Sequence, residues 1–296
     1  MISESVLNFL MEIGVLSFVI PVGVLLAWRI RTKKNFKPAV AGVLGYIGFG
    51  LLLRRVFDTF FLYTRNPVSQ VLNANNVLYY LYWGLVAAIF EEIGRYLVYK
   101  YFMREEKDRF VAISYGIGAG AVEMICVTGL TDLSYYIFAN VYNENPKGIK
   151  EQALIDTLKS LNTTDLVISG LMQLFFFGLQ ICLSVLVLEA YRNVAERKRY
   201  MVIAMVTHMI SFLPAGCHGQ KYISHIMAAV LLFIILAFAF FLARGVYLGM
   251  RKNDLNLAKE EKKQAKLNGK QDNFSFAKQK FTNIDTDKNK KKDDTV

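Results

Sequence analysis

The sequence predicts an all-α protein, a polytopic transmembrane helix bundle. Of its 296 residues, 54% are hydrophobic, and the mean hydropathy is +0.31. The chain has only five prolines, and long runs rich in Phe, Leu, Ile and Val alternate with short basic segments. A soluble protein of this length has more polar surface and shorter apolar runs. We therefore expect one membrane bundle rather than a set of soluble domains.

Seven apolar stretches resemble bilayer-crossing helices, which need about 20 mostly apolar residues. They lie at roughly 6–28, 38–62, 78–102, 110–131, 165–190, 201–216 and 222–246. The segment Leu133–Val141 could form an eighth, re-entrant or interfacial piece. The polar segment Tyr142–Thr164 is predicted to be a solvent-exposed outer loop. The first stretch lacks a basic start, so we interpret it as a retained span rather than a cleaved signal peptide.

The distribution of Lys and Arg predicts the orientation of these spans. Four basic clusters fall on one side of the membrane if the N-terminus is outside and the C-terminus is cytoplasmic. The clusters are at 29–37, 100–109, 192–199 and 251 onward. Arg54 and Arg55 do not fit this scheme because they interrupt the second stretch. They lie either at its outer end or toward the bundle interior, and the sequence leaves both open.

We expect the bundle to occupy residues 1–250 and a basic tail to occupy residues 251–296. The net charge of the chain is +11, and the tail holds 13 Lys/Arg and 8 Asp/Glu, or +5. Few aromatics and many charges predict a cytoplasmic tail that is disordered or weakly helical. Its expected partner is anionic lipid of the inner leaflet. No phosphate-binding loop or basic–aromatic surface stands out, so nucleic acid is not an expected partner.

Three charged residues interrupt the third apolar stretch, in the segment AIFEEIGRYL. An ionised side chain at bilayer depth costs about 2.5–3.5 kcal/mol on insertion scales, so it persists where it is paired or functional. Arg95 follows Glu91 by four residues and Glu92 by three, which places it beside both carboxylates on a helix. Gly94 allows another helix to approach. The structural alternative is a salt bridge at a cytoplasmic helix end.

Two further polar residues lie in later apolar stretches. Glu123, in SYGIGAGAVEMICV, follows Gly116 and Gly120 by seven and three residues and so shares their face, which predicts contact with a closely packed neighbouring helix. His208 lies in MVTHMISFLPAG. Each could equally be a hydrogen-bonded core residue. By depth, Glu91, Glu123 and His208 can share one layer, where they could hold a metal or activate water.

The other histidines and the cysteines are interpreted as loop or packing residues. The cysteines are odd in number, far apart and without a CxxC pair. These residues are His218, His225, Cys126, Cys182 and Cys217.

Three segments, FEEIGRYLVYK, YGIGAGAVE and HMISFLPA, resemble motifs of the YhfC-type intramembrane metalloproteases. These are distant relatives of the CAAX prenyl endopeptidases, the bacteriocin-processing enzymes and the PrsW-type proteases. The resemblance covers roughly residues 1–250 and implies a bacterial cytoplasmic membrane protein. It implies that Glu91 and Glu92 activate water for attack on a peptide bond and that Arg95 holds a carboxylate in place. His208 matches a histidine that binds metal or polarises the carbonyl, and Glu123 matches the acid of the second motif.

The chain departs from the family pattern at two positions. The second motif usually reads GHG before the acid, but its middle residue here is Ala119. The third motif usually has Asp or Asn four residues after the histidine, but here Phe212 takes that place. If the missing histidine is a ligand, Glu91 or Glu92, Glu123 and His208 would have to supply the three that a catalytic zinc needs.

Three functions therefore stay open. The first is an intramembrane metallopeptidase that uses Zn²⁺ or another divalent metal to hydrolyse a membrane-embedded or membrane-associated peptide. The second is a catalytically inactive relative that binds a membrane partner, for example as an immunity-type protein. The third is an ion-coupled transporter that uses the carboxylates as cation or proton sites. The first predicts that the acids and His208 surround one cavity.

Overall fold

The computed structural model describes residues 1–106, 108–146 and 151–293, with side chains for most of them up to residue 264. Within these ranges every regular element is helical, as the sequence predicts. The helices of the first half are α1 (Glu4–Thr32), α2 (Lys37–Gly45), α3 (Arg54–Asp58), α4 (Pro67–Ala74), α5 (Asn76–Tyr101), α6 (Phe110–Met124) and α7 (Leu130–Glu144). The later helices are α8 (Gln152–Ser160), α9 (Thr163–Arg192), α10 (Arg197–Ser211), α11 (Leu213–Gly219) and α12 (His225–Asp293). Three π-helical stretches join some of them: η1 (Tyr46–Leu53), η2 (Thr59–Tyr63) and η3 (Ile125–Gly129).

In the described part of the chain, six helical segments are long and apolar enough to cross a membrane. A seventh is added if α4 and the part Leu78–Tyr101 of α5, which meet at a bend of 112°, form one span. The charged residues Glu91, Glu92 and Arg95 all lie on α5. Six to seven spans agree with the predicted bundle.

The structure differs from the expected topology in two places. The helices α6, η3 and α7 form one continuous helical stretch of 35 residues, Phe110–Glu144, so Leu133–Val141, left open as an eighth piece, belongs to the fourth span. The region predicted as an exposed loop contains α8, whose Ile155 and Leu158 are buried against Leu10 and Tyr142. A nine-residue amphipathic helix in a polar segment covers the end of the bundle there.

Caps define the ends of the long helices. The Ser3 hydroxyl accepts a hydrogen bond from the Val6 N–H at the start of α1, and the Asn162 side chain accepts one from the Asp165 N–H at the start of α9. These side chains satisfy backbone donors that the first turn leaves unpaired. Helix α1 ends at Thr32, and the capping residue Lys33 adopts a left-handed conformation with φ 56° and donates its N–H to the Arg29 carbonyl.

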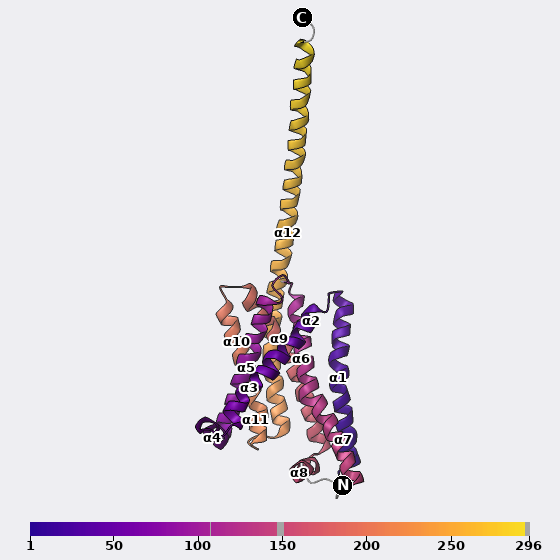
Figure 1. Ribbon diagram of the computed structural model, residues 1–296, viewed down its shortest axis with the longest axis vertical. Coiled ribbons are helices and arrows are strands. Elements are labelled where there is room, and N and C mark those ends of the chain that lie inside the picture. The colour runs from indigo at the N-terminus through magenta and orange to yellow at the C-terminus, as the bar shows by residue number, and fades with distance from the viewer. Residues whose placement is uncertain (107, 147–150, 294–296) are drawn as a thin grey trace. The chain divides into compact units, whose positions relative to one another are not determined.

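Helices α6 and α9 form the centre of the bundle. Figure 1 shows α1 at one edge, α10 at the other, and α5, α6 and α9 between them. Glycines allow the central pair to approach: a Cβ atom on Gly116 would lie 2.5 Å from the Ile181 Cα, and one on Gly120 would lie 2.9 Å from the Phe177 ring. The predicted close packing at the Gly116–Gly120 face is therefore confirmed.

The basic loops adjoin one another at one end of the bundle. Lys34, after α1, forms a 2.6 Å ion pair with Asp108, in the loop before α6. The Tyr191 hydroxyl, at the end of α9, donates to the Arg104 carbonyl at 3.4 Å. This shared end agrees with the clustering of positive charge that the sequence predicts, while the orientation of the bundle in the membrane stays a prediction.

The chain divides into two compact units, Met1–Tyr247 and Leu248–Val296. The predicted roles of a bundle up to residue 250 and a separate basic tail stay predictions. Helix α12 begins in the first unit and extends as a helix to Asp293 in the second. The disorder of the tail and its contact with anionic lipid stay predictions.

Candidate functional site

The five residues singled out in the sequence converge on one buried polar cluster. Glu91, Glu92 and Arg95 come from α5, Glu123 from α6 and His208 from α10, and each side chain belongs to a residue that is at most 5% exposed. Hydrogen bonds connect all five through the neighbouring helix α9. The five residues therefore lie together in the structure, as their positions in the sequence predict.

Glu92 is held on both of its carboxylate oxygens. Arg95 Nη1 donates to Glu92 Oε2 at 3.0 Å, and His208 Nδ1 lies 2.7 Å from Glu92 Oε1. Charge-assisted contacts of this kind are shorter and stronger than neutral hydrogen bonds. Because Nδ1 of His208 is fixed by Glu92, the other ring nitrogen, Nε2, points toward Glu91.

Gln180 is the central residue that the sequence interpretation missed. Its Nε2 donates to Glu91 Oε2 at 2.9 Å and to Glu123 Oε2 at 2.8 Å. Its Oε1 accepts a hydrogen bond from Arg95 Nη2. One amide therefore joins helices α5, α6 and α9. An amide inside the apolar segment FFFGLQICLS was the available signal, since such groups commonly bond between membrane helices.

Glu91 is held less tightly than Glu92. Its Oε2 accepts from Gln180 and lies 3.7 Å from His208 Nε2, while its Oε1 lies 3.7 Å from Arg54 Nη1. The two longer distances exceed those of a hydrogen bond. Among the described residues, the buried Nε2 of His208 has no hydrogen-bond partner. Glu91 and His208 thus present polar atoms toward each other across a short gap.

A second buried pair extends the cluster toward the second span. Arg54 Nε lies 3.4 Å from Asp58 Oδ2, and the Arg54 guanidinium lies 5.0 Å from the centre of the Trp83 ring. The neighbouring Arg55 is exposed and lies over the Tyr63 ring. The two arginines therefore separate: Arg54 faces the bundle interior, and Arg55 lies on its surface.

Two π-helical stretches adjoin the cluster. Stretch η1 immediately precedes Arg54, and its Gly50 lies against Glu91, whose Cγ would be 3.3 Å from an added Cβ. Stretch η3 begins at Ile125, two residues after Glu123. The π-helix is rare and often found at functional sites because it changes the direction of side chains on either side.

The donors of this cluster are arranged as a hydrogen-bonded network rather than as a metal coordination sphere. Across the described ranges, no group of three or more His, Cys, Asp and Glu side chains could hold a metal ion. The amide nitrogen of Gln180 stands between Glu91 and Glu123, and Arg95 and Arg54 already place two positive charges beside the acids. The predicted ligand set of His208, Glu123 and a glutamate does not fit zinc in this arrangement.

The two departures from the family pattern have structural explanations. Ala119 is buried, and its backbone nitrogen would lie 3.0 Å from a Cβ on Gly42 of α2, so this position serves close helix packing. Phe212 stacks on His208 with ring centres 5.6 Å apart and also contacts Trp83 at 5.1 Å. The phenyl ring covers one side of the imidazole.

The remaining histidines lie outside the cluster. His218 and His225 stack with ring centres 4.2 Å apart, and His225 Nδ1 contacts Asp165 Oδ1 at 2.9 Å. Their interpretation as packing residues agrees with these contacts. Cys126, Cys182 and Cys217 are free thiols.

Comparisons with known proteins agree with the motifs. The model of the YhfC intramembrane metalloprotease family matches residues 16–251. The chain is 26% identical over 246 residues to the uncharacterized membrane protein YhfC of Bacillus subtilis (strain 168), a match that covers 80% of this chain and 94% of that protein. No solved structure matches. The family match spans most of the bundle, including every residue of the buried cluster, and the chain belongs to the YhfC intramembrane metalloprotease family.

Proposed function

We propose that the protein is an intramembrane endopeptidase in which Glu91 activates water and His208 polarises the scissile carbonyl. The observation that carries the proposal is the pair Glu91 Oε2 and His208 Nε2, 3.7 Å apart and buried between α5 and α10. Two atoms at this separation can both reach one water or carbonyl oxygen at hydrogen-bond distance.

The supporting contacts divide the two adjacent glutamates between different roles. Glu92 is engaged on both oxygens, so it serves to orient His208 and to balance the charge of Arg95. Glu91 keeps one oxygen, Oε1, at 3.7 Å from Arg54 Nη1, beyond hydrogen-bond distance, so this oxygen is free to accept a proton from water. Glu91 is therefore the better general base, and Glu92 is a positioning residue.

The proposed reaction uses no metal, because the donor atoms of the cluster are not arranged as a metal coordination sphere. Glu91 takes a proton from water, and the resulting hydroxide adds to the peptide carbonyl carbon. His208, as the imidazolium, donates an Nε2 hydrogen bond to the oxygen that gains negative charge. When the C–N bond breaks, Glu91 returns the proton to the leaving nitrogen. The products are a carboxylic acid and an amine, so atoms and protons balance.

The surroundings of the cluster limit the class of substrate. The side chains of the site are enclosed by helices of an apolar bundle and are almost without exposure. A substrate that is membrane-embedded or membrane-associated can approach such a site from the bilayer, whereas a soluble protein would have to cross the bundle surface. We therefore infer a peptide substrate held in or on the membrane.

The experiment compares new protein termini in membranes of cells that produce the wild type, Glu91→Gln or His208→Gln. Peptide cleavage predicts neo-N-termini in membrane proteins that appear with the wild type and are lost with both variants. Glu12→Gln is the matched control because Glu12 is exposed on α1, away from the cluster. Thermal unfolding of each purified variant checks that the fold is retained.

The result that would contradict the proposal is a set of termini that does not change between the wild type and Glu91→Gln, with both proteins folded and equally abundant. Binding of a membrane protein that survives both substitutions would instead support the catalytically inactive relative. Uptake of cations or protons into proteoliposomes, lost on Glu91→Gln, would support the carrier.

A further inference from the structure

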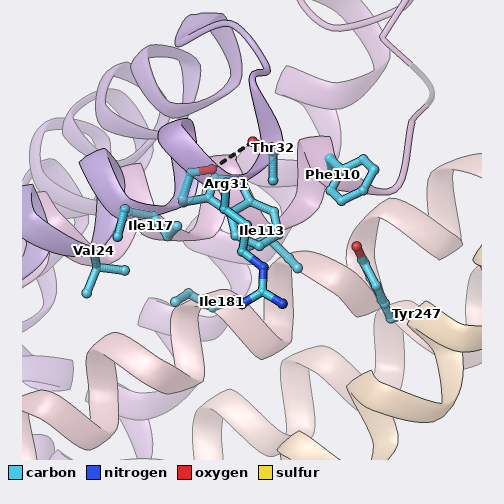
Figure 2. Close-up of a pocket in the computed structure, with 10 residues that line it drawn as sticks. Val24, Arg31, Thr32, Phe110, Ile113, Ile117, Ile181 and Tyr247 are labelled. Atoms are coloured by element: carbon cyan, nitrogen blue, oxygen red, sulfur yellow. Dashed lines mark hydrogen bonds between the residues drawn. The ribbon is translucent and has the colours of Figure 1, made fainter.

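A pocket lies between α1, α6 and α9, and none of its lining residues belongs to the polar cluster. Its volume is about 710 Å³. Figure 2 shows apolar side chains of α1, α6 and α9 on its walls, with Phe110 and Tyr247 at one side. The lining residues are Val24, Ala27, Trp28, Arg31, Thr32, Phe110, Ile113, Ile117, Ile181 and Tyr247.

Arg31 is the charged residue of this lining. Its guanidinium extends from α1 toward Ile181 (Figure 2). The other polar groups of the lining are engaged within the protein: Trp28 Nε1 donates to Ser114 Oγ at 2.9 Å, and the Thr32 hydroxyl donates to the Trp28 carbonyl at 2.8 Å. The pocket therefore combines an apolar wall with one cationic group.

Three other basic side chains lie near the pocket, but none belongs to its lining. Lys34 pairs with Asp108 at 2.6 Å and also lies 5.5 Å from the centre of the Phe110 ring, and the Arg29 guanidinium lies over the Phe36 ring at 5.4 Å. The Arg109 guanidinium lies against the Phe110 and Tyr247 rings, 4.5 and 5.6 Å from their centres. Within the described part of the chain, Arg31 forms no ion pair with an acidic side chain. Its positive charge thus faces the pocket without a carboxylate to balance it.

We propose that this pocket binds one anionic phospholipid, with an acyl chain along the apolar wall and the phosphate on Arg31. Basic pockets between membrane helices on the cytoplasmic side are suited to anionic headgroups. Trp and Tyr side chains are enriched at the depth of lipid headgroups, and Trp28 and Tyr247 lie beside Arg31 in the lining. A free phosphate ion would use the guanidinium but leave the apolar wall uncovered, so a lipid complements the pocket better.

The site is independent of the proposed peptidase chemistry. None of its lining residues belongs to the cluster of Glu91, Glu92 and His208. All of its lining residues belong to the unit Met1–Tyr247, and none belongs to the basic tail. The lipid site can therefore be tested without a protease assay.

The chain offers an optical probe, since it contains two tryptophans. Trp28 lines the pocket, whereas Trp83 contacts Arg54 in the polar cluster. In the Trp83→Phe variant, all tryptophan fluorescence comes from Trp28. The purified full-length variant is titrated in detergent with phosphatidylglycerol or phosphatidylcholine carrying brominated acyl chains, which quench a tryptophan that they touch.

We expect brominated phosphatidylglycerol to quench Trp28 at about fivefold lower concentration than brominated phosphatidylcholine, the preference that one basic residue provides. Arg31→Gln should reduce the preference to about one. Arg29→Gln, on the same helix but directed at Phe36, should keep it. A preference caused by the tail would persist in Arg31→Gln, so that result would overturn the proposal.

Two other outcomes would also overturn the site. Equal quenching by both lipids in the parent variant would show that Arg31 does not select an anionic headgroup. Loss of the preference in the presence of an equal concentration of inorganic phosphate would assign Arg31 to a free anion. If Trp83→Phe does not fold, the same titrations with the two tryptophans retained compare Arg31→Gln with its parent, because the Trp83 signal is common to both.

Discussion

His208 Nδ1 lies 2.7 Å from Glu92 Oε1, and this contact joins α10 to α5 across 116 residues of sequence. It fixes the imidazole so that its second nitrogen faces Glu91. A carboxylate that holds one nitrogen of a histidine sets the tautomer and orientation of the ring. In the proposed mechanism, Glu92 is therefore the positioning partner of His208, and the adjacent Glu91 is the general base. Five predictions follow from this arrangement and from the packing around it.

Gln180 should contribute to stability because it satisfies three charged groups. In Gln180→Leu, Arg95 loses one acceptor, and Glu91 and Glu123 each lose a donor. A buried polar group without a partner costs about 1–3 kcal/mol, so we expect a lower unfolding temperature in detergent. Gln173→Leu is the matched control: Gln173 is also buried on α9, but its Nε2 has no partner among the described residues. Equal destabilisation by both substitutions would contradict the role of Gln180.

Arg54 and Arg55 should differ in their effect on activity although they are neighbours. Arg54→Met removes the positive charge that faces Glu91 and leaves Asp58 unpaired, so the peptidase rate should fall about 100-fold, the lower range of a lost general base. Arg55→Met should leave the rate unchanged because Arg55 is exposed. The rate is measured by the yield of the wild-type neo-N-termini at equal protein abundance. A similar loss in both variants would mean that the charge of this segment acts only through membrane insertion.

Gly116 should tolerate no side chain. A Cβ in Gly116→Ala would lie 2.5 Å from the Ile181 Cα and would push α6 away from α9. Overpacking of this kind costs about 1–3 kcal/mol. Gly23→Ala, in α1, is the control, since an added Cβ there has nothing within 4 Å and alanine favours the helix. Thermal unfolding should therefore show opposite signs for the two substitutions, and an unchanged midpoint for Gly116→Ala would refute the close contact.

Removal of metal should leave the fold intact. The described residues contain no three-ligand set of His, Cys, Asp and Glu, and the acids of the cluster are held by Gln180, Arg95 and Arg54. Dialysis against EDTA should leave the unfolding temperature unchanged, and added Zn²⁺ should not raise it. Elemental analysis of the purified protein is the second measurement. Stoichiometric zinc that disappears in His208→Gln would mean that the side chains rearrange around a metal.

The ion pair of Lys34 and Asp108 should make a small, pH-dependent contribution to stability. Partial burial raises the pKa of Asp108, but the hydrogen bonds from Lys34 and the Phe110 N–H outweigh it and hold the pKa below its ordinary value. The stabilisation is therefore present above the ordinary carboxyl range and is lost as the pH falls through the lowered pKa.

The contribution of that pair is at most about 1 kcal/mol because both side chains are partly exposed. Asp108→Asn should lower the unfolding temperature slightly at neutral pH, and the difference from the wild type should vanish in acid. Glu105→Gln, on the same loop but exposed, serves as the control. A difference that grows in acid would have the wrong sign for this pair.

The convergence of the cluster could be predicted from the sequence because charged side chains in apolar membrane helices all turn away from lipid and toward the protein interior. Glu91, Glu123 and His208 each lie near the middle of an apolar stretch, and a membrane helix turns such groups toward protein. Gln180 was missed because an amide carries no charge, and its partners lie on other helices. The sequence therefore identifies the acids and the histidine but not the residue that joins them.

The placement of Arg54 and Arg55 could not be decided from spacing. Counting at 3.6 residues per turn fails across η1, because a π-helical stretch has wider turns and rotates everything that follows it. The helix α8 was missed for a different reason: its two buried apolar residues become apparent only when the start of α1, the end of α7 and the start of α9 supply their partners. The open question about the arginines and the missed helix both depend on structure that hydropathy and residue spacing do not carry.

For the proposed peptidase, the burial of the cluster implies a latent state. Glu92 and His208 are 0% and 1% exposed, so a substrate reaches Glu91 only when α5 and α10 separate. The turnover of the proposed peptidase then equals the intrinsic rate multiplied by the open fraction; if about 1% of molecules are open, the turnover is about 1% of the intrinsic rate. Turnover would depend weakly on the residues at the cleaved bond and strongly on bilayer thickness or on a partner that separates these two helices.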